Sequence, residues 1–95
     1  MQININEEAA NWYIKELQLK EGDFVRFFPR YGGVGGNIPG FSIGINTNEP
    51  MDLQTKATYD GVTFYIEKED LWYFDDKNLT INFNEKLNEP EFLYE

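Results

Sequence analysis

Residues 55–66 read Thr-Lys-Ala-Thr-Tyr-Asp-Gly-Val-Thr-Phe-Tyr-Ile, and they carry the clearest structural signal in the chain. Side chains alternate along it on both sides of Asp60-Gly61, which is the pattern of two strands joined by a two-residue turn. Asp-Gly suits a type I′ turn because both central residues of that turn take a positive φ. The stretch therefore predicts a β-hairpin.

Two segments before the hairpin predict further strands. Asp23 to Tyr31 is rich in aromatic and β-branched residues. Residues 41–46 alternate apolar and small or polar side chains, which is typical of a strand with one face on the core. Residues 46–53 contain Asn, Thr, Pro and Asp in a turn-rich order and predict an irregular connection.

The N-terminal segment predicts a short strand followed by a helix. Gln2 to Ile5 alternates polar and apolar residues, and Asn6 is a good N-cap. Apolar residues then recur at helical spacing, and Gly22 supplies a stop signal. We expect one amphipathic helix over residues 7–19.

The C-terminal third is less regular. Residues 67–74 fit either a helical turn or an extended piece, and residues 75–78 predict a turn. Leu79 to Phe83 predicts the last strand, and residues 84–95 read as an acidic tail that contains Pro90 and has no clear period. The whole chain, residues 1–95, therefore predicts a single mostly β domain, α+β by content, with one helix packed on one side.

Composition restricts the classes of partner. The chain has 95 residues, with 17 Asp and Glu against 8 Lys and Arg, so its formal net charge is −9. This charge repels phosphate backbones and anionic lipids, which argues against nucleic-acid and membrane partners. It serves solubility and is compatible with a basic protein surface. The 17% aromatic content would support a homodimer.

The absence of cysteine and histidine removes several kinds of chemistry. No disulfide or thiolate metal site can form, which favours a cytoplasmic location, and no signal peptide or apolar membrane-length run is present. Ser42 is the only serine and has no histidine to activate it, so we expect no enzyme activity. Carboxylates at 75–76 and at 89, 91 and 95 fit solvated surface better than a metal site, and we expect no cofactor.

Four glycines in six residues mark the most unusual segment, residues 32–37. Such a loop can present its amides to an anion, with arginines on the preceding strand adding positive charge. A flexible or tight connection is the simpler interpretation, since no helix N-terminus or Lys-Ser/Thr pair follows. The candidate ligand or partner site comprises Arg26, Arg30, Gly32, Gly33, Val34, Gly35, Gly36 and Asn37.

The order of these features resembles the HesB/IscA-like family, the A-type iron–sulfur carriers. It is carried by Glu8-Ala9-Ala10, a helix, a strand ending in Arg30, the glycine loop and Pro39-Gly40-Phe41. Tyr59-Asp60-Gly61-Val62 and the strand at 79–83 continue it. The resemblance covers roughly residues 3–83 and implies compact sheets in a β-sandwich or barrel-like HesB-like domain.

The resemblance also implies what this chain has lost. The family holds iron or an iron–sulfur cluster with three cysteines, one in the glycine loop and two near the C-terminus. The loop cysteine would fall at Val34, and the C-terminal pair is replaced by Glu91 to Glu95. Thiolates, and histidine as the usual exception, are the ligands of such clusters. We therefore expect a non-catalytic, cysteine-free relative that docks on proteins, including iron–sulfur assembly proteins, or regulates them; the alternative is an anion or small-ligand binder.

Overall fold

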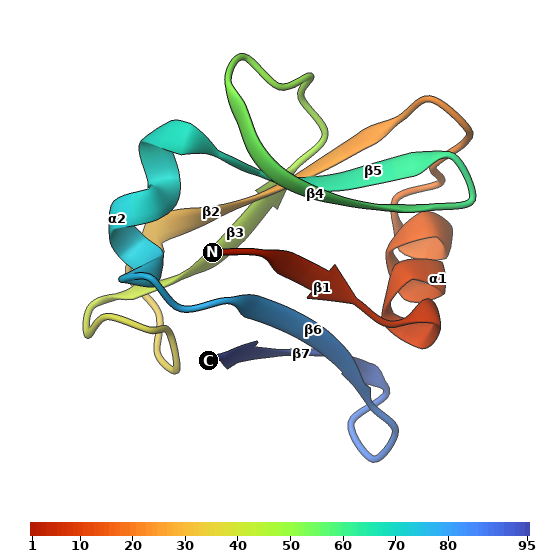
Figure 1. Cartoon of the computed structure of the whole chain (residues 1–95). Coiled ribbons are helices and arrows are strands. Elements are labelled where there is room, and N and C mark those ends of the chain that lie inside the picture. Colours follow the sequence, from red (N-terminus) through yellow and green to blue (C-terminus); the bar gives the residue numbers. More distant parts are fainter.

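Two β-sheets with a helix at either end form the fold of this computed structural model, which describes residues 1–95 (Figure 1). Strands hold 44% of the residues and helices 18%, which confirms the mostly β prediction. The elements are β1 (Ile3–Ile5), α1 (Glu7–Glu16), β2 (Phe24–Tyr31), β3 (Phe41–Asn46), β4 (Leu53–Tyr59), β5 (Val62–Glu67), the 3-10 turn η1 (Lys68–Asp70), α2 (Leu71–Phe74), β6 (Leu79–Asn84) and β7 (Glu89–Tyr94).

The larger sheet has the strand order β3-β2-β5-β4, and the smaller one has the order β1-β6-β7. The β4–β5 hairpin is confirmed: Tyr59 pairs with Val62, and Asp60 and Gly61 take φ values of 50° and 75°. The sheets meet where β1 lies beside β4 (Figure 1), and the Ile3 N–H donates to the Thr55 hydroxyl at 3.3 Å. The two sheets thus enclose one core.

That core is lined by both sheets and both helices. Val25 and Phe27 of β2, Phe64 of β5 and Ile81 of β6 are fully buried. Tyr13 of α1 joins them, with its ring centroid 5.4 Å from that of Phe27. Large aromatic side chains therefore supply much of the apolar burial in a domain too small for a large aliphatic core.

Helix α1 begins as predicted and ends earlier. The Asn6 side chain accepts a hydrogen bond from the Ala9 N–H at 2.9 Å, so Asn6 is the N-cap. The helix ends at Glu16 and not at residue 19, because Gln18 takes the left-handed conformation with φ 52°. The Leu19 N–H then bonds to the Ile14 carbonyl, which is the pattern of a Schellman C-cap with glutamine in the usual glycine position.

The prediction of an irregular acidic tail was wrong. Residues 89–94 form β7, which pairs antiparallel with β6 in the register Leu79 to Tyr94. Phe92 and Tyr94 are half-buried against the core while Glu91 and Glu95 are exposed, so the tail does alternate. Pro90 lies on the edge strand of its sheet, a position that tolerates proline.

Three further segments are now defined. Residues 68–74, which the sequence left open, form η1 and α2, with Tyr73 and Phe74 fully buried. Strand β4 begins at Leu53 with a register shift before Thr55, so the irregular connection is shorter than expected. Neither helix is long and apolar enough to cross a membrane.

Candidate functional site

The glycine loop connects β2 to β3 and projects its tip into solvent. Its base is closed by the Gly32 N–H, which donates to the Gly40 carbonyl at 2.7 Å. Val34 at the tip is 94% exposed, and among the large apolar side chains only Met51 is more exposed. A hollow of about 430 Å³ lies between the loop and Phe41. The tip is thus an apolar side chain held away from the core.

The second half of the loop is fixed on α2. The Asn37 N–H donates to the Tyr73 hydroxyl and the Asn37 side-chain amide donates to the Tyr73 carbonyl, both at 2.8 Å. Lys77 donates to the Asn37 side-chain oxygen at 3.2 Å. A Cβ at Gly36 would collide with the Phe41 carbonyl and the Tyr73 hydroxyl, so glycine is required there for close approach.

Tyr73 also links the loop to the C-terminal strand. Its hydroxyl lies 3.4 Å from the hydroxyl of Tyr94 on β7. Burial, and then the hydrogen bond with Tyr73, raises the pKa of Tyr94 above that of a free phenol. Tyr94 therefore stays protonated at neutral pH.

A row of aromatic side chains flanks the loop. The ring centroids of Tyr31 and Phe41 are 5.8 Å apart, those of Phe41 and Trp72 are 5.4 Å apart, and both pairs meet edge to face. Tyr31 is 86% exposed and Trp72 is 55% exposed. We call Tyr31, Val34, Phe41 and Trp72 the aromatic face.

The two predicted arginines lie in different surroundings. Arg30 is exposed beside the loop, and its guanidinium lies 3.5 Å from the Ser42 hydroxyl. Gly33 of the loop also lies next to Ser42, because a Cβ at Gly33 would contact the Ser42 side chain. Arg26 instead forms ion pairs with Asp70 at 2.7 Å and with Glu69 at 2.9 Å. Burial raises the pKa of the Asp70 carboxyl and Arg26 opposes that shift. The structure thus brings Arg30, and not Arg26, to the glycine loop.

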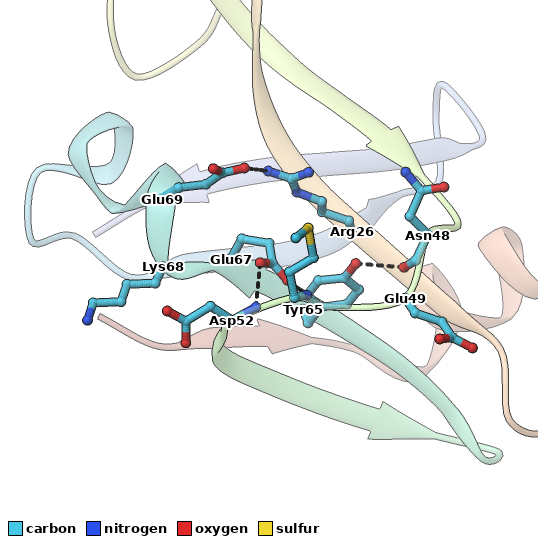
Figure 2. A pocket seen from close by; sticks show the side chains of 9 residues that line it. Arg26, Asn48, Glu49, Asp52, Tyr65, Glu67, Lys68 and Glu69 are labelled. Carbon is cyan, nitrogen blue, oxygen red and sulfur yellow. Dashed lines mark hydrogen bonds and ion pairs between the residues drawn. The ribbon is translucent and has the colours of Figure 1, made fainter.

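A second hollow, of about 700 Å³, lies on the outer face of the larger sheet under residues 47–52, which we call the strap (Figure 2). The Glu67 carboxylate accepts hydrogen bonds from the Met51 N–H at 2.9 Å and the Asp52 N–H at 2.8 Å. The Tyr65 hydroxyl donates to the Asn48 carbonyl at 2.6 Å, and Figure 2 shows these contacts converging under the strap.

The buried polar side chains of this hollow, Glu67 and Tyr65, hold the strap. Its lining contains four carboxylates and two cations, and no buried side-chain nitrogen or oxygen in the structure lacks a hydrogen-bond partner. No sequence motif pointed to it, because Glu67 reads as the polar end of a strand. The hollow therefore shows how the strap is anchored and does not present a buried unpaired group to a ligand.

The family model described as "Iron-sulphur cluster biosynthesis" matches residues 1–93 of the chain. The chain belongs to this family. The iron–sulphur cluster biosynthesis fold thus extends into β7, beyond residue 83 where the recognisable sequence pattern stopped.

Three similar proteins cover most or all of the chain. A protein named "Pyruvate dehydrogenase inhibitor" from Bacillus subtilis (strain 168) is 47% identical over 95 residues, covering 100% of both chains. An uncharacterized protein of Staphylococcus saprophyticus is 39% identical over 95 residues, covering 97% of each chain. An uncharacterized protein of Staphylococcus aureus (strain MRSA252) is 36% identical over 85 residues, covering 86% of this chain and 87% of its own. No solved structure gave a significant match.

Tyr73 links the two segments in which the resemblance places the cysteines of the family. Under the resemblance described above, Val34 occupies the position of the loop cysteine and residues 91–95 replace the C-terminal pair. In this structure the loop and β7 are joined through Asn37, Tyr73 and Tyr94. Protonated phenols are poor metal ligands, and no three acidic side chains lie close enough together to hold a metal ion.

Proposed function

We propose that this chain is a non-catalytic regulator that binds a pyruvate dehydrogenase and lowers its activity. The observation that carries the proposal is the 47% identity to the Bacillus subtilis protein named as an inhibitor of that enzyme, over the full length of both chains. Because the alignment covers the whole of the relative, the inhibiting surface of that protein lies within a region that this chain matches over its full length.

The chemistry of the chain supports binding in place of catalysis. A cluster carrier in this family would need thiolate ligands, and the chain has neither cysteine nor histidine. Ser42, the one serine, has the Arg30 guanidinium beside it and no base within hydrogen-bond reach. Arg26, the most enclosed arginine, is paired with carboxylates. What remains available to a partner is shape, apolar surface and charge.

The test is an inhibition assay with purified components. The chain is titrated into the pyruvate dehydrogenase complex of Bacillus subtilis, and the rate of NADH formation is followed. We expect a saturable fall in rate, unchanged by added iron chelator, because the proposed action needs no metal. An unrelated acidic protein of similar size and charge controls for non-specific binding to basic surfaces.

Two results would contradict this proposal. One is an unchanged rate at a large molar excess of the chain over the complex. The other is inhibition that develops only after iron and sulfide have been supplied, because that would mean a bound cluster is the active species. Iron–sulfur assembly proteins, the other class of partner that family membership supports, then become the next to test by direct binding.

A further inference from the structure

We propose that the aromatic face, formed by Tyr31, Val34, Phe41 and Trp72, is the docking surface of this chain, and that it fits an apolar depression with a basic rim on the pyruvate dehydrogenase. The identity of the partner rests on the function proposed above. Three properties support the surface itself: the exposure and the rigidity of the residues around the glycine loop, and the net negative charge of the chain.

Exposure is the first argument. Seven large apolar side chains of the molecule are exposed, and three of them, Tyr31, Val34 and Trp72, belong to the aromatic face. The other four lie singly on β3, the strap, the β6–β7 turn and β7. Scattered apolar side chains are ordinary on a protein surface, whereas a group of aromatic ones is typical of an interface.

Rigidity is the second argument. Asn37 fixes the loop on Tyr73 through two hydrogen bonds, and the Gly32 to Gly40 hydrogen bond closes its base. Phe41 holds the rings of both Tyr31 and Trp72 edge to face. A surface that is ordered before binding loses less conformational entropy on association, so more of the free energy of its apolar contacts contributes to the binding affinity.

Charge selects the partner chemistry. The segment that carries Trp72 has exposed carboxylates at Glu69, Asp75 and Asp76 and exposed cations at Lys68 and Lys77, so that with Arg30 the charges next to the face balance. The whole chain adds a net charge of −9. This field favours approach to a positively charged surface and repels an acidic one. An apolar depression on a basic protein, with a basic rim, therefore complements the apolar face and the net negative charge of the whole chain.

The experiment compares four forms of the full chain: wild type, Val34→Asp, Trp72→Ala and the control Met51→Asp. Met51 is 96% exposed on the strap, so it matches the 94% exposure of Val34 in a different segment that is not part of the aromatic face. Each form is first checked for an unchanged thermal unfolding midpoint. Co-sedimentation with the Bacillus subtilis pyruvate dehydrogenase complex and inhibition of NADH formation are then measured on the same samples.

We expect Val34→Asp and Trp72→Ala each to weaken co-sedimentation at least about 10-fold, as substitutions at the centre of an interface do. Met51→Asp should bind like wild type, and wild-type association should slow as salt is raised. If wild type co-sediments without inhibiting and the face variants lose binding, the docking surface stands and the inhibitory function is wrong. If the face variants bind like wild type, or wild type does not bind, the docking surface is wrong.

Discussion

The backbone N–H of Asn37 donates a 2.8 Å hydrogen bond to the hydroxyl of Tyr73, which lies 36 residues further along the chain. The Asn37 side chain returns to the Tyr73 backbone, so loop and helix are joined twice. The same hydroxyl faces Tyr94 on the C-terminal strand. One tyrosine therefore connects the glycine loop, α2 and β7, and most of what can be tested in this region depends on it.

Replacing Tyr73 with phenylalanine should destabilise the domain by about 1–3 kcal/mol, because the Asn37 N–H loses its acceptor in a partly buried place. Chemical denaturation followed by circular dichroism measures this. Hydrogen exchange should also accelerate at the Asn37 amide. Tyr31→Phe is the control: Tyr31 is 86% exposed and its hydroxyl has no partner, so its loss should change stability by less than about 0.5 kcal/mol. Equal stability of the two variants would contradict the anchoring role.

Gly36→Ala should cost about 1–3 kcal/mol, since the added methyl group meets the Phe41 carbonyl and the Tyr73 hydroxyl and the loop must shift to admit it. The φ of Gly36 is not positive, so the cost comes from space and not from backbone strain. Val34→Ala, at the exposed tip, should be nearly neutral in the same unfolding assay. A neutral Gly36→Ala would mean that the loop is not seated on α2 as described.

Glu67→Gln should release the strap. The two oxygens of the Glu67 carboxylate accept hydrogen bonds from the N–H groups of Met51 and Asp52. In glutamine one of these oxygens becomes an NH₂ group, which cannot accept a hydrogen bond, so one of the two bonds is lost. We expect a loss of about 1–3 kcal/mol and faster amide exchange at residues 51 and 52. Glu49→Gln provides the control, because Glu49 is exposed and makes no hydrogen bond. Unchanged exchange at both amides would argue against this anchor.

Alkaline pH should destabilise the protein through Tyr13. Burial raises the pKa of Tyr13 above the value of 10.0 for a free phenol, so above pH ~10 the unfolded chain releases a proton that the folded chain keeps. Stability is then fully present below that pH and falls above it, by up to about 1.4 kcal/mol per pH unit for this group. Tyr13→Phe should flatten the fall in unfolding free energy between pH 10 and 11, whereas Tyr31→Phe should not.

Anaerobic reconstitution with iron and sulfide should leave the protein colourless. No cysteine or histidine is available, and the Tyr94 phenol that faces the loop stays protonated because burial raises its pKa. Metal analysis and visible absorbance measure this directly. Stoichiometric iron together with a visible cluster band would show that oxygen ligands or an external thiol complete a site.

Local patterns predicted most of the strands, and long-range pairing explains the rest. The hairpin at Asp60-Gly61 was readable because turn chemistry and alternation lie in one short stretch. Strand β7 was missed because Pro90 and the acidic side chains obscured its alternation, which becomes visible only beside β6. Helix α1 was predicted too long because glutamine seldom takes the left-handed C-cap conformation that Gln18 adopts.

The candidate site was predicted in part. The glycine content identified the loop, and its placement beside Arg30 follows from the strand that precedes it. Nothing local indicated that Arg26 pairs with Asp70, 44 residues away, or that Asn37 binds Tyr73. The homodimer suggested by the aromatic content stays a prediction, and the composition could not show that Tyr31 and Trp72 lie on two sides of Phe41, because only the fold brings them together.

The parallel pairing of β1 with β6 has a consequence for how the protein is made. Ile3 pairs with Leu79, so β1 has no strand to pair with in its sheet until β6, more than 70 residues later, has been translated. Contacts this distant in sequence also slow folding, because a long loop must close before they form. A translation product interrupted before residue 79 would lack β6 and β7 and, with them, the buried Leu79 and Ile81 of the core. The smaller sheet can therefore form only after β6 has left the ribosome.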